Sequence, residues 1–190
     1  MQKTYSMTIA GCKRELALCP VSDTLDIAAF IMFGDVELTE KAAEALLKKC
    51  PPHDVIVTAE AKGIPLAYEM ARQAGIDDYV VARKGPKLNM KNIITTEVDS
   101  ITTDHIQTLC LGDKETNLLK GRRVLIVDDV ISTGQSLLSL EKLVNQVGGN
   151  IVGKMAVLAE GDAADREDII FLQKLPLFRK LSDGEYNAID

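Results

Sequence analysis

Residues 124–136 read VLIVDDVISTGQS, and this stretch decides the fold. Its first four residues are apolar and predict a strand that is buried on both faces. Asp128 and Asp129 follow where we expect the strand to leave the sheet. In open α/β sheets, ligands bind in the crevice beyond the carboxyl ends of the strands, so this pair of carboxylates marks a candidate binding site.

The residues after the aspartates are typical of a phosphate-binding loop. They are Ser132, Thr133, Gly134, Gln135 and Ser136. The helix predicted next offers unpaired N–H groups to an anion, the glycine allows close backbone approach, and the hydroxyls can donate to phosphate oxygens. The loop has no Lys, unlike GxxxxGK[ST], which disfavours a nucleoside-triphosphate site. The aspartates are then placed to accept from ribose hydroxyls or to hold Mg²⁺ through water.

Outward from this stretch, short apolar strands alternate with helices. We predict strands over residues 5–9, 16–19, 55–57, 80–82 and 151–158. Helices are predicted after Thr39 as N-cap, from Pro65 to Gly75 and over residues 137–147, whereas residues 83–118 predict an antiparallel excursion without a helix. The alternation predicts an α/β fold, a doubly wound parallel sheet with helices on both faces. We expect a single domain over residues 1–190, with residues 1–36 as a subsidiary lobe.

Composition and charge exclude several classes of protein. The chain has 190 residues, 46% hydrophobic and 26% charged, and no apolar run approaches the ~20 residues that span a bilayer. A net charge of −6 and a pI of about 5.0 argue against a broad nucleic-acid-binding face or a basic membrane patch. Residues 1–16 lack the pattern of a secretory signal, so we expect a cytoplasmic protein. The four cysteines form no CxxC pair and are expected to be reduced.

Residues 124–136 closely resemble the phosphoribosyl-pyrophosphate signature of type I phosphoribosyltransferases. The resemblance implies a parallel sheet with a flexible hood, to which residues 1–36 would contribute. It also implies that Asp128 and Asp129 bind the ribose 2′- and 3′-hydroxyls and that residues 132–136 bind the 5′-phosphate. In this family a loop residue of one subunit often serves the neighbouring site, so a homodimer is implied as well.

Two further segments resemble the same family. Residues 58–65 read TAEAKGIP and look like its pyrophosphate loop, which implies binding by Glu60, Ala61, Lys62 and Gly63 and often holds a non-proline cis peptide bond. Residues 81–87 read VARKGPK and resemble the segment that enters the catalytic flexible loop of adenine and xanthine phosphoribosyltransferases. The resemblance implies that Arg83, Lys84 and Lys87 meet pyrophosphate.

Base selection is predicted from three residues. Phe30 and Phe33 are candidates to stack on a planar base, and a role in the core is the alternative for both. Glu160 stands where xanthine enzymes carry a Lys, and a carboxylate suits an exocyclic amine better than a carbonyl, which favours adenine. The glutamate that handles the purine proton in adenine enzymes has no counterpart at its usual place, and Asp104 is a candidate substitute.

The favoured hypothesis is a Mg²⁺-dependent transfer of phosphoribose from phosphoribosyl pyrophosphate to a purine, with Asp128, Asp129 and Lys62 as catalytic residues. The aspartates would hold the metal through water. A regulator that binds phosphoribosyl pyrophosphate without catalysis is the alternative from another class. It would need a nucleic-acid surface, which the charge of −6 does not favour. Xanthine or orotate transfer is the enzymatic alternative, although the dense Arg-Lys loop with His expected of the orotate branch is missing.

Overall fold

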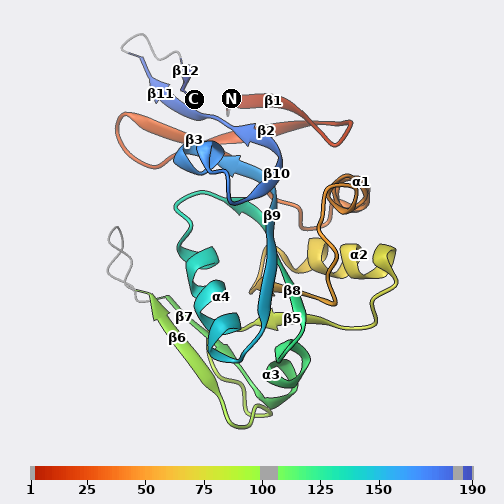
Figure 1. The fold of residues 1–190 in the computed structure, drawn as a ribbon. Coiled ribbons are helices and arrows are strands. Elements are labelled where there is room, and N and C mark those ends of the chain that lie inside the picture. The colour runs from red at the N-terminus through yellow and green to blue at the C-terminus, as the bar shows by residue number, and fades with distance from the viewer. Residues whose placement is uncertain (1–2, 99–106, 182–185, 190) are drawn as a thin grey trace.

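A computed structural model describes residues 3–98, 107–181 and 186–189 and shows a central parallel sheet beneath a smaller hood (Figure 1). The strands of the central sheet, in spatial order, are β10 (Ile170–Leu175), β9 (Asn150–Glu160), β8 (Arg123–Ile131), β4 (Val55–Ala59) and β5 (Tyr79–Ala82). All four neighbouring pairs are parallel. The predicted parallel sheet is therefore confirmed.

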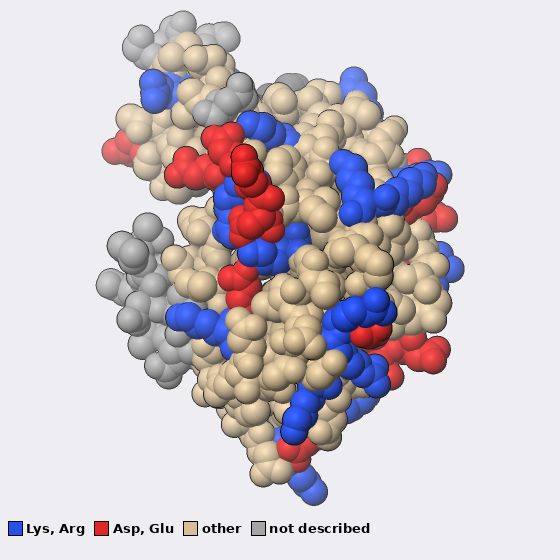
Figure 2. Space-filling model, viewed as in Figure 1, with Lys and Arg blue, Asp and Glu red and all other residues tan. Residues whose placement is uncertain are grey.

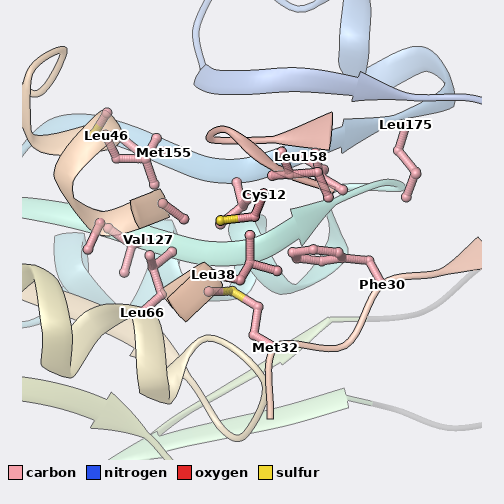
Figure 3. Close-up of a cluster of buried hydrophobic side chains, with 14 of the residues drawn as sticks. Cys12, Phe30, Met32, Leu38, Leu46, Leu66, Val127, Met155, Leu158 and Leu175 are labelled. Atoms are coloured by element: carbon pink, nitrogen blue, oxygen red, sulfur yellow. The ribbon is translucent and has the colours of Figure 1, made fainter. Parts of the chain in front are cut away.

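Helices cover both faces of this sheet. Helices α1 (Val36–Leu47) and α2 (Ile64–Ala74) pack on one face, and α3 (Asp113–Leu119) and α4 (Gln135–Gln146) pack on the other. Successive residues of one strand alternate between the two cores, with Leu125 and Val127 in the first and Ile126 in the second. Figure 3 shows the first core, where Leu46 and Leu66 of the helices meet Val127 of the sheet. This alternation explains why the strands read as continuous apolar runs.

The hood is an antiparallel sheet that joins the two ends of the described chain. Its strands are, in spatial order, β1 (Thr4–Ile9), β2 (Cys12–Pro20), β3 (Leu25–Ala29), β11 (Leu177–Lys180) and β12 (Tyr186–Ile189). The Tyr5 and Phe178 rings lie 5.0 Å apart, and Lys180 forms a 3.1 Å ion pair with the buried Asp26. The predicted N-terminal hairpin is confirmed. Residues 1–36 were expected to contribute to the hood, and strands β11 and β12 from the other end of the chain complete its sheet.

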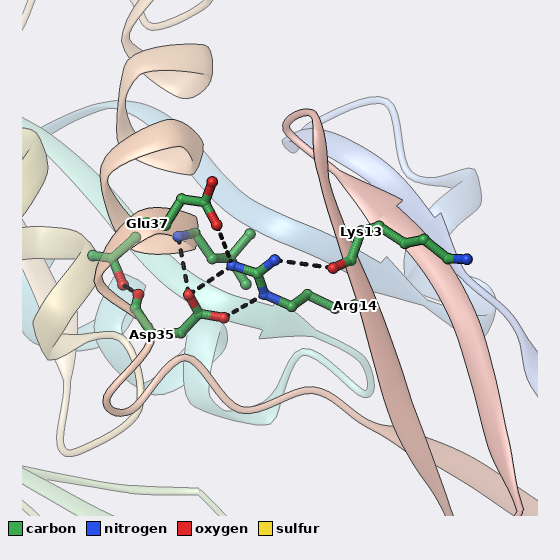
Figure 4. Close-up of polar contacts among 6 residues, drawn as sticks. Lys13, Arg14, Asp35 and Glu37 are labelled. Atoms are coloured by element: carbon green, nitrogen blue, oxygen red, sulfur yellow. Dashed lines mark hydrogen bonds and ion pairs between the residues drawn. The ribbon is translucent and has the colours of Figure 1, made fainter.

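An ion-pair cluster attaches the hood to helix α1 (Figure 4). Arg14 of β2 donates from Nε and Nη2 to Asp35, at 2.6 and 2.9 Å, and Nη2 also donates to Glu37 at 2.9 Å. Asp35 is the N-cap, because its side chain accepts from the Leu38 N–H. The prediction that Thr39 caps this helix is therefore wrong: the helix begins one turn earlier, and Thr39 donates its hydroxyl to the Asp35 carbonyl.

Residues 83–98 and 107–119 include the predicted antiparallel pair of strands and an unpredicted helix. Strands β6 (Ile94–Val98) and β7 (Gln107–Leu111) pair antiparallel, and Arg83 bridges to Cys110 and so ties the pair to the end of β5. The prediction that this region lacks a helix is wrong, because α3 follows β7. Asp104 lies outside the described residues.

Two smaller sequence predictions can be compared with the structure. All four cysteines are unpaired; Cys12 and Cys110 are buried, whereas Cys19 and Cys50 are only partly buried. Among the described residues, no helix is long and apolar enough to cross a membrane.

Candidate functional site

A cavity of about 390 Å³ opens at the carboxyl end of the central sheet. Five parts of the chain supply its lining: the end of β4 with the loop that follows it, the segment after β5, strand β7, the last part of β8 and the first turn of α4. The lining residues are Ala59, Glu60, Ala61, Lys62, Lys84, Thr108, Leu109, Asp128, Asp129, Val130 and Ser136. The structure thus brings together residues that the sequence places in three separate motifs.

The two aspartates lie within β8 rather than after it. Pairing of β8 with β4 ends at Ile126, whereas pairing with β9 continues to Ile131. The prediction that the strand ends before the carboxylates is therefore wrong. The carboxylates nevertheless face a cavity, because β8 extends past the end of its neighbour β4.

Both carboxyl groups have raised pKa values. Asp129 is 4% exposed, and its Oδ2 is buried without a hydrogen-bond partner among the described residues. Burial raises the pKa of Asp128 well above its usual range, and the neighbouring charge of Asp129 raises it further. Burial also raises the pKa of Asp129, while the Lys62 ammonium lowers the pKa of both groups. The pair therefore favours a cation or a hydrogen-bond donor in the cavity.

The loop after β4 has the features that the sequence predicted. The Glu60–Ala61 peptide bond is cis. At Gly63, the first residue before α2, a Cβ atom would lie 2.2 Å from Thr58 Oγ1 and 3.3 Å from Asp128 Cα. Glycine is required here because a side chain would collide with Thr58 and crowd Asp128.

The basic segment after β5 is positioned by Glu60. The Glu60 carboxylate accepts from the Lys84 N–H at 2.9 Å and from Arg83 Nη1 at 3.2 Å, and the Lys84 contact chiefly lowers the pKa of Glu60. Lys84 lines the cavity, whereas Arg83 and Lys87 are not among its lining residues. In this structure Glu60 serves to hold the basic segment in place.

The predicted phosphate loop leads into α4, and no side chain caps the N–H groups in the first turn of this helix. Gly134 is the N-cap, with φ of +77°. Ser132 and Thr133 are exposed, Ser136 lines the cavity, and Gln135 Oε1 is buried without a partner among the described residues. Unpaired N–H groups at this end can bind an anion.

The three predicted base-binding residues do not line the cavity. Phe30 is 4% exposed and packs in the core with Met32 and Leu38, which favours the core alternative for this ring (Figure 3). Phe33 is 52% exposed. Glu160 is the last residue of β9, not part of the following segment, and burial raises its pKa while Lys62 lowers it.

Sequence reasoning missed two sets of residues near the site. Thr108 and Leu109 reach the cavity from β7, which the Arg83–Cys110 bridge ties to the end of β5 and which also packs against α4. Arg166 follows the 3₁₀ helix η1 (Gly161–Asp165) and comes close to Gly134. No local pattern marks these residues, because only the tertiary fold brings them to the site.

Comparisons with known proteins agree on one family. The model of the phosphoribosyl transferase domain matches residues 33–176. Adenine phosphoribosyltransferase of Rhodococcus jostii is 32% identical over 149 residues, 77% of this chain and 78% of the relative. Xanthine phosphoribosyltransferase of Clostridioides difficile is 29% identical over 69% of this chain and 70% of the relative.

A regulator is also among the relatives. The purine biosynthesis transcriptional repressor PurR of Bacillus subtilis is 30% identical over 59% of this chain, and the match spans only 38% of the repressor. Among solved structures, adenine phosphoribosyltransferase of Thermoanaerobacter pseudethanolicus superposes with a TM-score of 0.70 at 23% identity, covering 84% of this chain and 95% of that one. At this identity the superposition shows the shared fold.

Proposed function

The chain belongs to the phosphoribosyl transferase domain family, and on that premise we propose that it transfers a 5-phosphoribosyl group from phosphoribosyl pyrophosphate to a purine base. One observation carries the proposal. The aspartate pair, Lys62 and the open first turn of α4 surround one cavity at the carboxyl end of the sheet. These groups complement, in turn, a ribose, a pyrophosphate and a terminal phosphate.

In the proposed reaction, a purine nitrogen forms a bond to the anomeric carbon as the bond from that carbon to pyrophosphate oxygen breaks, and the N–H proton of the purine ring is released to water. The electron pair of the broken bond leaves with pyrophosphate, whose charge Lys62 and Lys84 neutralise. Asp128 and Asp129 accept from the ribose hydroxyls and stabilise the positive charge that develops on the sugar. Positioning and electrostatics are the main contributions of these residues.

The aspartate pair also suits a magnesium ion. Oxygen ligands are what Mg²⁺ prefers, and Asp129 Oδ2 is a buried acceptor without a partner among the described residues. No group of three or more His, Cys, Asp or Glu side chains that could hold a metal occurs in the part of the chain that the structure describes. We propose that Asp128 and Asp129 hold the ion through water, together with substrate oxygens. When bound, Mg²⁺ supplies positive charge that neutralises the pyrophosphate.

Adenine is the base we propose. Glu160 supports this choice: it ends β9, the strand next to β8, and the Lys62 ammonium lowers its pKa. An ionised carboxylate accepts from an exocyclic amine and donates nothing to a carbonyl. Glu160→Lys should therefore weaken adenine use relative to xanthine. An unchanged ratio of kcat/KM for the two bases would refute the role of Glu160, and a wild-type preference for xanthine would refute the adenine assignment.

The test of the function itself is pyrophosphate release from phosphoribosyl pyrophosphate and Mg²⁺ with adenine, xanthine, guanine, hypoxanthine and orotate in turn. We expect turnover with a purine. The repressor relative supports a second candidate, a regulator that binds phosphoribosyl pyrophosphate without catalysis. Binding without turnover of any base would select the regulator.

We also propose that the protein is a homodimer. Four large apolar side chains near the start of α1 and on α2 are exposed: Ile31, Phe33, Val36 and Tyr68. An exposed apolar group of this kind is typical of an interface. Light scattering coupled to size exclusion should give the mass of two chains, and Val36→Glu should shift it toward one. A monomeric wild-type protein would contradict this proposal.

A further inference from the structure

The guanidinium of Arg166 lies directly over the predicted phosphate loop. Arg166 Nη1 is 2.9 Å from the point that a Cβ atom of Gly134 would occupy. Gly134 has φ of +77°, so glycine is favoured there by its backbone conformation as well as by this contact. The cation is therefore close to the N-terminus of α4, where an anion is expected.

A chain of ion pairs holds Arg166 in this position. Asp168 accepts from Arg166 Nε at 2.8 Å and from Nη2 at 2.7 Å, in the two-point geometry that suits a guanidinium. Lys154 of β9 pairs with Asp168 and also with Glu141 of α4, the latter at 2.6 Å. Figure 2 shows acidic and basic side chains meeting below the hood on this face of the molecule. Glu141 and Lys154 thus connect Asp168 to the same helix whose N-terminus Arg166 approaches.

This arrangement leaves one nitrogen of Arg166 available. Asp168 occupies Nε and Nη2, and Nη1 forms no hydrogen bond with the residues that the structure describes. The two positive and two negative charges of the ion-pair chain balance, so the chain itself places no net charge beside the loop. Residues 132–136 contain no Lys or Arg, yet a phosphate monoester carries roughly 1.5 to 2 negative charges at neutral pH.

We propose that Arg166 Nη1 binds the 5′-phosphate of phosphoribosyl pyrophosphate, with Asp168 and Lys154 as positioning residues. The inference rests on the proposed function. Arg166 supplies the cation that the loop lacks, while the loop N–H groups and hydroxyls supply the remaining donors. It also gives the site a means to distinguish a ribose that carries the 5′-phosphate from one that does not.

The test measures binding of the two halves of the substrate, ribose 5-phosphate and pyrophosphate, separately. Calorimetry with the full chain and Mg²⁺ measures the affinity for ribose 5-phosphate, and separately for pyrophosphate, in wild type, Arg166→Gln, Arg166→Lys and Asp168→Asn. Because a hydrogen bond to a charged group is lost, Arg166→Gln should weaken ribose 5-phosphate binding by about tenfold to a hundredfold and leave pyrophosphate binding unchanged. Arg166→Lys, which keeps the charge, and Asp168→Asn should show smaller losses. In turnover, KM for phosphoribosyl pyrophosphate should rise more than kcat falls.

Arg123→Gln is the matched control. Arg123 also forms a two-point pair, with Asp54, but at the start of β8 and so at the opposite end of the strand from the aspartate pair. A purely structural Arg166 would behave like this control, with a change in unliganded melting temperature and no selective loss of ribose 5-phosphate. If Arg166→Gln binds ribose 5-phosphate within twofold of wild type, the inference is wrong while the proposed function stands. If wild type binds neither ribose 5-phosphate nor phosphoribosyl pyrophosphate, both are wrong.

Discussion

Asp129→Asn should stabilise the unliganded protein while it removes activity. The Asp129 side chain is 4% exposed, its Oδ2 has no partner among the described residues, and burial raises its pKa. A buried polar group without a partner costs about 1–3 kcal/mol, and the charge of Asp128 adds to this. The introduced amide is neutral, so it also removes the charge that raises the pKa of Asp128. We expect a gain of about 1–2 kcal/mol, which corresponds to a rise in melting temperature of roughly 2–8 °C.

The pH dependence of this gain has a definite sign. Because the pKa of Asp129 is raised on folding, the carboxylate destabilises the folded state at neutral pH, and this effect is lost as pH falls through the raised pKa. The difference in melting temperature between variant and wild type should therefore be largest at neutral pH and should shrink toward pH 4. Thermal unfolding followed by circular dichroism across that range measures it.

The catalytic activity of Asp129→Asn should fall, although the stability of the unliganded variant rises. Loss of the carboxylate that faces the ribose should lower kcat/KM for the best purine at least about a hundredfold, or roughly 2.7 kcal/mol of transition-state stabilisation. Asp54→Asn is the control. Asp54 is half-buried, pairs with Arg123 at the start of β8 and has its pKa lowered to about 2, so its loss should bring no gain in melting temperature and no loss of activity. A lower melting temperature of unliganded Asp129→Asn at neutral pH, or turnover equal to wild type, would refute the reasoning.

Three further predictions concern the loop, the hood and the aspartate pair. Gly63→Ala should lower the melting temperature by roughly 2–12 °C and abolish phosphoribosyl pyrophosphate binding, because the alanine Cβ would lie 2.2 Å from Oγ1 of the fully buried Thr58. Gly85→Ala is the control: space around Gly85 is open, so neither the melting temperature nor the binding should change. The Arg14 guanidinium holds the pKa of Asp35 below its usual value, so the ion pair stabilises the fold above about pH 4 and this contribution is lost as pH falls further. Asp35→Asn keeps the helix cap but removes the ion pair, so the melting temperature of the variant should fall less steeply with acid than that of wild type. An equal fall in the two proteins would contradict this. Mg²⁺ and phosphoribosyl pyrophosphate should release more protons on binding as the pH falls from 7 toward 4, since both aspartates have raised pKa values in the free protein. At the acid end of that range, binding enthalpies that do not vary among buffers of different ionisation enthalpy would contradict this.

The parts of the fold that sequence could predict are those with a local physical cause. Strands β4 and β5 are short because their apolar runs are bounded by charged residues, and helix α2 is capped by Gly63 and Gly75. The end of β8 could not be predicted in the same way. Asp128 and Asp129 stay in the strand because β9 continues to pair beside them, which is a property of the neighbour rather than of the two residues.

The candidate site likewise contains residues that local sequence patterns could predict and residues that only the tertiary fold brings there. Each of its motifs is a continuous stretch of sequence, so Lys62, the aspartate pair and Ser136 could be predicted from sequence patterns. The structure places all of them around one cavity. Arg166 lies 32 residues after Gly134, in a segment with no pattern of its own, and reaches the loop only because β9 returns the chain to the same end of the sheet. Residues of this kind depend on the tertiary fold, which local patterns do not encode.

The hood has a consequence for the order in which the protein folds. Strand β3 pairs with β2 close by in the sequence and with β11 from the far end of the chain. During synthesis, β11 is made only after every strand of the central sheet, so the parallel sheet can assemble while β3 still presents an open edge. Contacts between distant segments form slowly, so completion of the hood is expected to be the last step. The interval before that step is when this chain is most exposed to pairing with another copy of itself through β3.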